Sequence, residues 1–198
     1  MMIYRKLMLG DTKQIAQLHE KAFKQFFLTS LGKEFLKEFY YSILQNKNSI
    51  AIGCFQEDDL IGFAVGTLEV KGFYLQILKS NFLNLFISSL KYIFQKPSII
   101  IRIIQGIIKK DNELLPQNDN PASLLSICVD PNFSDKGIGS SILVEFEKII
   151  SMHKKVIVLT TDSIDNEKVN TFYKAKDYKL QGQFLQGARK MNLYIKYL

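Results

Sequence analysis

Cysteine is scarce in this chain of 198 residues, and that scarcity excludes a fold stapled by disulfides. The two cysteines, Cys54 and Cys128, each lie in an apolar, strand-like run, where a small thiol is normally buried. The amino-terminal residues 1–6 also lack the apolar run of a secretory signal. Together these absences predict buried free thiols in a reducing compartment, and a cytoplasmic protein.

Acidic residues are absent from residues 71–110, although this segment contains seven lysines and arginines. The whole chain carries 26 basic and 19 acidic residues, so its net charge of +7 arises in this one segment. Apolar residues recur there at helical spacing and predict an amphipathic pair of helices, the second opened by Pro97. The predicted apolar side holds Leu75, Leu78, Phe82, Leu85, Phe86 and Ile93.

Several roles remain open for this segment. It could be a plain helical excursion packed on the fold, a lid over a substrate, a homodimer surface, or a contact with anionic lipid. The pattern favours the first three over a peripheral membrane contact. A transmembrane span is disfavoured because it needs about 20 continuous apolar residues, and Lys79 interrupts the run. Nucleic acid is disfavoured because the basic residues are dispersed and no recognition motif accompanies them.

A strand, a loop with two glycines and a helix follow one another between residues 124 and 150. Residues 124–129 have the length and composition of a buried strand, and apolar residues from Ile138 onward recur at helical spacing. Gly137 and Gly139 permit a tight turn and close approach by a ligand. The first N–H groups of a helix lack intrahelical partners, and its dipole adds roughly half a positive charge there. The loop therefore predicts an anion site beside Lys136, unless it is only a strand-to-helix turn.

Two common phosphate-binding motifs are missing from this loop. A Walker A motif needs a glycine, four residues and then Gly-Lys-Ser/Thr, which the loop does not contain. The dinucleotide fingerprint needs a third glycine, but residue 142 is isoleucine. Both of those phosphate-binding folds are therefore disfavoured.

The loop resembles motif A of the GNAT superfamily of acyl-CoA-dependent N-acetyltransferases, whose pattern is Arg/Gln-x-x-Gly-x-Gly/Ala. Here the corresponding residues are Ser134-Asp135-Lys136-Gly137-Ile138-Gly139, preceded by Val129-x-Pro131. Residues 166–178 resemble a second family pattern, Asn-x-x-Ala-x-x-Phe-Tyr-x-x-x-Gly-Phe, and the predicted strand 156–160 lies between the two motifs. The resemblance is close over about residues 122–180 and holds only in outline elsewhere.

The fold class that the resemblance implies is α/β with a mixed sheet (α+β). We expect a single GNAT-like domain over residues 1–198, with a helical insertion at about 71–120 and a central sheet that splays open beside Ser134. Strands are expected near 2–8, 49–55, 60–70, 124–129, 156–160, 179–185 and 191–197. One helix is expected to begin at Asp11 with a capping pattern to Gln14, and another to span 31–45. The first helix would bury Ile15, Leu18, Ala22 and Phe26.

The resemblance also implies acetyl-CoA as co-substrate and no metal. Backbone N–H groups of residues 135–140 would hold the pyrophosphate, the backbone of Ile127 and Val129 would pair with the pantetheine arm, and Asn166 would contact the cofactor. Tyr173 would protonate the departing sulfur. The expected cofactor-binding residues are Ile127, Cys128, Val129, Ser134, Asp135, Lys136, Gly137, Ile138, Gly139, Ser140, Asn166 and Tyr173.

Three residues depart from the family pattern. Ser134 stands where arginine or glutamine is usual, Val169 replaces alanine and Asp177 replaces glycine. Either the site still works or it no longer binds acyl-CoA. The first interpretation is favoured because the backbone groups that hold phosphate do not depend on the side chain at residue 134.

The base that deprotonates the amine has two candidates, Glu69 and His19. Glu69 could instead be an exposed carboxylate at a strand end. The intrinsic pKa of histidine suits a base, but His19 lies between Leu18 and Glu20 and could instead be a surface or capping residue. His153 is expected to interact with a helix C-terminus, and a water-relayed base remains open. Covalent catalysis by Cys128 is disfavoured because a buried thiol is usually inert.

The predicted function is transfer of an acetyl group from acetyl-CoA to a small-molecule amine. Transfer would be direct, in a ternary complex, and the acceptor could be an amino sugar. The alternative is a non-catalytic acyl-CoA-binding or protein-interaction module that retains the fold.

Overall fold

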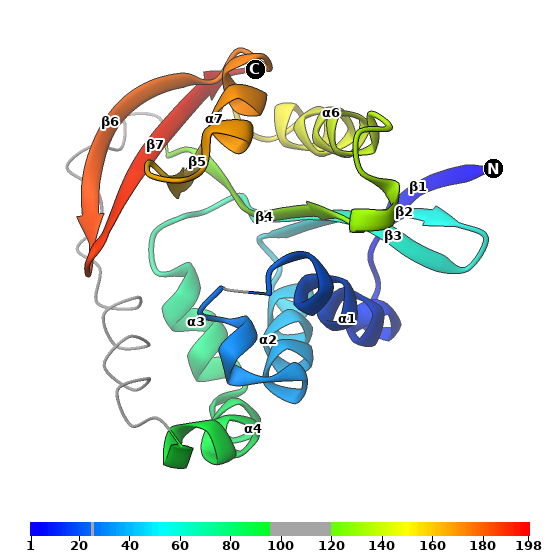
Figure 1. Ribbon diagram of the computed structural model, residues 1–198, viewed down its shortest axis with the longest axis vertical. Coiled ribbons are helices and arrows are strands. Elements are labelled where there is room, and N and C mark those ends of the chain that lie inside the picture. Colours follow the sequence, from blue (N-terminus) through cyan, green and yellow to red (C-terminus); the bar gives the residue numbers. More distant parts are fainter. Residues whose placement is uncertain (25, 96–119) are drawn as a thin grey trace.

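A computed structural model describes residues 1–24, 26–95 and 120–198 (Figure 1). The strands are β1 (Met2–Lys6), β2 (Ser49–Gln56), β3 (Asp59–Thr67), β4 (Ala122–Val129), β5 (Val156–Asp162), β6 (Lys179–Gln186) and β7 (Arg189–Tyr197). The helices are α1 (Thr12–Ala22), α2 (Lys33–Gln45), α3 (Phe73–Ser80), α4 (Phe82–Gln95), α6 (Ile138–Ser151) and α7 (Glu167–Lys174), and a 3-10 turn, Pro131–Phe133, follows β4. The expected order of elements in the described residues is confirmed.

All seven strands belong to one mixed sheet in the order β1-β2-β3-β4-β5-β7-β6. Every neighbouring pair is antiparallel except β4 and β5, which run parallel. That parallel pairing extends only from Ala122 opposite Ile157 to Leu124 opposite Leu159. Beyond Leu124 the two strands separate, so the expected splay in the centre of the sheet is confirmed.

Helices cover both faces of this sheet (Figure 1). On one face α6 and α7 bury a core that includes Ile142, Phe146 and Tyr173. On the other face α1, α2 and α3 bury a second core around Ile15, Leu36 and Phe73. The gap between β4 and β5 therefore lies between two separately packed helical layers.

Glycines on β3 let α6 lie close to the sheet. A Cβ added at Gly62 would meet the Ile142 side chain 2.6 Å away, and one at Gly66 would meet the Phe146 ring and the Ser123 carbonyl. Both clashes involve well-packed neighbours. These glycines thus set the distance between α6 and the sheet. The first turn of α6 follows the loop that contains Gly137.

The start of α1 differs from the predicted capping pattern. Asp11 precedes the helix, but its carboxylate accepts hydrogen bonds from the Met8 N–H and the Arg5 guanidinium, each within 2.8 Å. The Gln14 side chain donates to the Asp58 carbonyl and accepts from the Leu60 N–H, so it holds the β2–β3 turn. Phe26 lies beyond the helix and is 45% exposed. The capping expectation was wrong because tertiary partners outcompete the local ones.

The predicted apolar side of the insertion is also only partly buried. Leu85 packs inward and Leu78 is half-buried, whereas Leu75, Phe82 and Phe86 are each more than 40% exposed. Asn81 interrupts the helical run between α3 and α4, so the two helices do not share one face. The helix predicted from Pro97 lies outside the described residues. Among those residues no helix has the length and apolar character needed to span a membrane.

Candidate functional site

The loop between β4 and α6 has a backbone that turns its N–H groups outward. Asp135 and Gly137 both adopt left-handed conformations, with φ of 60° and 75°. Alternation of this kind gathers successive N–H groups into a concave, anion-binding surface. We call residues 135–140 the cradle.

The cradle has both free donors and free space. Its backbone N–H groups form no hydrogen bond to the described residues; the first helical bond here runs from the Ser141 N–H to the Gly137 carbonyl. A Cβ added at Gly137 would meet no atom within 4 Å, and one at Gly139 would meet only Val129, 3.6 Å away. A cavity of about 350 Å³ also borders the first turn of α6 at Ser140. Unpaired donors at a helix start, facing open space, fit a phosphate group.

Two lysines bring positive charge to the cradle. Lys136 lies over the Phe133 ring, 5.1 Å from its centroid. Lys168, on α7, makes an exposed 2.9 Å ion pair with the carboxylate of Asp135. The sequence prediction missed Lys168 because only the fold brings α7 beside the cradle.

Asp130 anchors the loop that precedes the cradle. Its carboxylate accepts hydrogen bonds from the Lys21 ammonium at 2.6 Å and the Asn132 N–H at 2.8 Å. Burial raises the pKa of Asp130, but these two donors outweigh it and the net shift is downward. The carboxylate therefore stays ionised and ties α1 to the end of β4.

Beyond Leu124, β4 borders the gap. Residues 122–124 are buried where β5 pairs with them, whereas residues 125–127 are only half-buried. Leu125 has no partner in β3, because the register shifts between Val65 and Gly66. Ile127, Cys128 and Val129 lie in this open half of the strand, as their expected cofactor role requires; that role stays a prediction.

The start of α7 is held by a buried amide network. Asn166 donates to Thr161 and to the Asp162 carbonyl at the end of β5. Asn170 donates to the same carbonyl and accepts from Asn192 at 2.8 Å and from Tyr194 at 3.0 Å. This network fixes α7 against β5 and β7. The motif identified Asn166 but gave no signal for its partner Asn170.

Tyr173 lies on α7 in the core that faces α6 and is 6% exposed. Its ring packs against Phe172, Tyr178 and Tyr194. The hydroxyl forms no hydrogen bond within the described part of the chain. Burial raises the pKa of Tyr173, so the group keeps its proton at neutral pH. The hydroxyl thus carries the proton that a donor needs, although burial makes it a weaker acid; the predicted role is untested.

His19 is buried, contrary to its alternative interpretation as a surface residue. It is 3% exposed, and its Nδ1 lies 2.7 Å from the Tyr40 hydroxyl on α2. Burial lowers the pKa of His19 to about 4, so the imidazole is neutral at pH 7. The Tyr40 hydroxyl also interacts with the Ser126 side chain in the open half of β4. His19 is therefore linked to the open half of β4 through Tyr40, and its role as the base stays a prediction.

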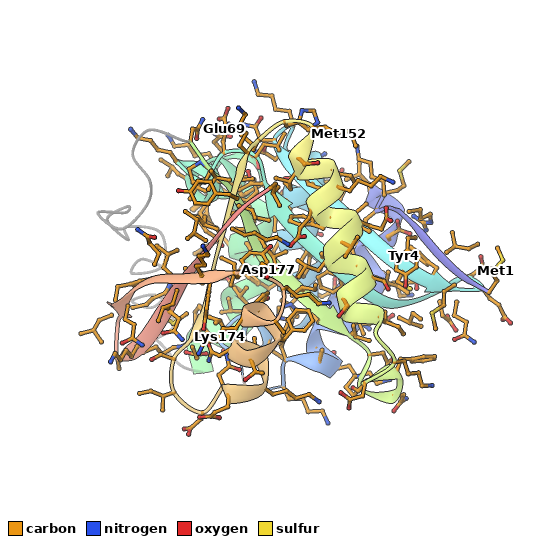
Figure 2. The ribbon with its side chains drawn as sticks, turned by 90° about the horizontal axis from the view of Figure 1, so that it is seen from above. Met1, Tyr4, Glu69, Met152, Lys174 and Asp177 are labelled. Carbon is orange, nitrogen blue, oxygen red and sulfur yellow. The ribbon has the colours of Figure 1, made fainter. Side chains whose placement is uncertain are left out.

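The structure separates Glu69 from the cradle. Glu69 follows the end of β3 that pairs with Ser123, whereas Gly62, at the other end, pairs with Val129 beside the cradle. It is exposed, accepts a hydrogen bond from Asn48, and lies toward the end of the molecule where Met152 follows α6 (Figure 2). Its role as the base stays a prediction.

Two other expectations concern Cys128 and His153. Cys128 is a buried free thiol whose pKa is raised well above the usual value by burial. It therefore stays protonated and is a poor nucleophile. His153 follows α6, and its backbone N–H donates to the Ile150 carbonyl.

Comparisons with solved structures match this arrangement over the whole chain. A GNAT-family protein from Desulfovibrio desulfuricans aligns with a TM-score of 0.65 at 12% identity, covering 100% of this chain and 99% of that one. The PaiA N-acetyltransferase from Thermoplasma acidophilum, in complex with coenzyme A, aligns at 0.61 with 17% identity, covering 100% and 99%. The chain has the GNAT fold. The ribosomal-protein-S18-alanine N-acetyltransferase from Escherichia coli also shares it, at 0.60 and 11% identity over 100% and 94% of the two chains.

Sequence comparison alone does not show this likeness. No protein-family model matches the chain, and no curated protein is matched by it. At 11–17% identity, the solved structures establish the GNAT fold, while the reaction must be argued from the site.

Proposed function

We propose that this chain is an acyl-CoA-dependent N-acyltransferase that uses acetyl-CoA. The observation that carries the proposal is the row of unpaired N–H groups in the cradle, at the mouth of the gap between β4 and β5. A helix start with open space around Gly137 suits the pyrophosphate of coenzyme A. The GNAT-fold protein of Thermoplasma acidophilum, which was solved with coenzyme A, supports this choice of ligand.

The two helical layers suggest how the substrates meet. The cradle belongs to the α6 face, and residues 125–127, where β4 no longer pairs with β5, are half-buried between the two layers. In our proposal the pantetheine arm follows β4 through this gap. The thioester would then meet an amine near Ser126, in a ternary complex.

The proposed transfer is a direct displacement. The amine nitrogen attacks the thioester carbonyl carbon, a new C–N bond forms, and the C–S bond breaks. Tyr173 supplies the proton for the departing thiolate, which its protonated hydroxyl can do. We propose that water takes up the proton lost by the amine, since His19 is buried beside Tyr40 and Glu69 is exposed beyond the end of β3.

A small-molecule amine is the proposed acceptor, and amino sugars are the first class to test. The alternative function is a non-catalytic module that binds acyl-CoA. Ser134 motivates that alternative, because it is exposed and supplies no long side chain to brace the cradle. The free backbone donors favour cofactor binding in either case.

Two assays separate these functions. Calorimetric titration with acetyl-CoA tests binding, and a thiol-release assay over amino sugars, polyamines and amino acids tests transfer. The proposal expects saturable binding and release of coenzyme A with at least one amine. Binding without release for every amine would favour the module, and absence of binding would overturn both.

A further inference from the structure

An apolar stripe runs along the outer side of α4. Phe82, Leu83, Phe86 and Ile87 are 60%, 70%, 46% and 62% exposed, and they succeed one another at the spacing of a single helical face. The rings of Phe82 and Phe86 stack with centroids 5.9 Å apart. Tyr74 and Leu75 on α3, 42% and 48% exposed, add to the apolar surface. We call the four α4 residues the outer stripe.

The inner side of α4 already has its partners. Leu85 is 3% exposed and packs in a core with Leu31 and Phe35, and Ser89 is also buried. Asn81, just before α4, donates a hydrogen bond to Glu38 on α2. One face of α4 thus packs against α2 and the turn at Leu31. The outer stripe is additional apolar surface that this packing does not require. Contiguous exposed apolar surface of this kind marks an interaction site.

The charged residues in the chain segment that carries the outer stripe are all positive. Residues 71–110 contain seven basic residues and no acidic one, and Lys71 and Lys79 are exposed beside α3 and α4. The acidic groups next to this region are Glu34 and Glu38 on α2, and Glu69, which precedes α3 and accepts a hydrogen bond from Asn48. Glu38 is bonded to Asn81, and Lys37 lies within 4.0 Å of both Glu34 and Glu38. These acidic groups thus already have basic or amide neighbours, whereas Lys71 and Lys79 have no ion pair among the described residues, so the described charge beside α3 and α4 favours an anion.

We propose that the outer stripe binds the surface of a bilayer that contains anionic lipid. Exposed apolar side chains, with lysines in the same segment that have no ion pair in the described part of the chain, match the boundary between acyl chains and acidic headgroups. A second copy of the chain fits less well, because the sequence of 71–110 is basic and contains no acidic residue, so two copies that met through this segment would repel one another. This inference is independent of the proposed function.

Co-sedimentation of the full chain with vesicles tests the proposal. One vesicle set contains phosphatidylcholine with phosphatidylglycerol, and the other contains phosphatidylcholine alone. We expect binding to the anionic vesicles at low salt, weaker binding at high salt, and little binding to the neutral set. Replacing both Leu83 and Ile87 by glutamine should lower the bound fraction about tenfold by removing apolar contact while leaving the charge unchanged.

Met152→Gln is the matched control, because Met152 is 67% exposed and directly follows α6, which lies on the opposite side of the sheet from α3 and α4 (Figure 1). This control should bind anionic vesicles as well as the native chain does. Circular dichroism of both variants should match that of the native chain, since all three side chains are exposed. Absence of binding, equal binding to neutral vesicles, or full binding by the double variant would overturn the proposal. A dimer in vesicle-free buffer that the double variant dissociates would assign the stripe to a second copy instead.

Discussion

The Lys168 ammonium on α7 lies 2.9 Å from the Asp135 carboxylate in the cradle, although 33 residues separate them in the chain. The ion pair joins the two segments that carry the family resemblance. It also neutralises the one acidic side chain within the cradle. Both groups are more than 70% exposed, so the pair matters for ligand binding more than for stability.

Lys168→Gln should weaken acetyl-CoA binding about three- to tenfold, and the effect should shrink as salt rises. The physical reason is that Asp135 would then repel the pyrophosphate. Titration calorimetry at two salt concentrations measures this. Lys174→Gln, the same charge change at the other end of α7, is the control (Figure 2). An equal loss in both variants would mean that only net charge matters.

Tyr173→Phe should lower turnover by about a hundredfold or more, because it removes the proposed proton donor. Affinity for acetyl-CoA should change little, since the ring and its packing remain. Tyr178→Phe is a suitable control, because it removes a buried hydroxyl from the same aromatic core and leaves the proposed proton donor in place. Unchanged turnover in Tyr173→Phe would remove that residue from the acid role.

Acid should destabilise the fold through His19. Its pKa is about 4 in the folded chain and 6.5 in the reference state, so the unfolded chain binds the proton more readily between these values. Stability should therefore fall as pH drops from about 6.5 toward 4, with a loss of about 2 kcal/mol from this group at pH 5. Urea unfolding at pH 7.5 and pH 5 measures it. His19→Gln should lose that part of the pH dependence, and an unchanged dependence would contradict the assignment.

Asp177 adopts a left-handed conformation, with φ of 65°, at the position where the family pattern has glycine. Asp177→Gly should therefore be neutral or stabilising, whereas Asp177→Val should lower the free energy of unfolding by about 1–2 kcal/mol. Thermal and urea unfolding of the two variants provide the comparison. Equal stability of the glycine and valine variants would show that the backbone at this position relaxes.

Local sequence pattern was sufficient for most of the fold. Alternating and helical periodicity located the strands and helices around the cradle, and the motif at residues 166–178 located α7. The splay between β4 and β5 followed from the resemblance and is confirmed by a parallel pairing that stops at Leu124. The strands and helices depend on neighbours along the chain, which a sequence displays, whereas the splay was predicted from the family resemblance.

Features set by distant partners were not predictable in the same way. His19 is buried because Tyr40, from another helix, covers it, and Gln14 leaves the helix start because the β2–β3 turn offers better partners. The periodicity of α4 marked apolar residues, but only packing against α2 shows that Leu85 faces inward and Phe82 outward. The periodicity of a helix shows which residues share a face, but it does not show which other element buries that face.

Binding of acetyl-CoA to the Gly137→Ala variant tests the central claim most directly. Gly137 has a φ of 75°, so alanine there should lower the free energy of unfolding by about 1–2 kcal/mol, but an added Cβ would meet no atom within 4 Å and the variant should still fold. If the cradle holds the pyrophosphate, that Cβ occupies the space of the ligand, and calorimetry should show affinity reduced about tenfold or more. Native affinity in a folded Gly137→Ala variant would contradict the assignment of the cradle.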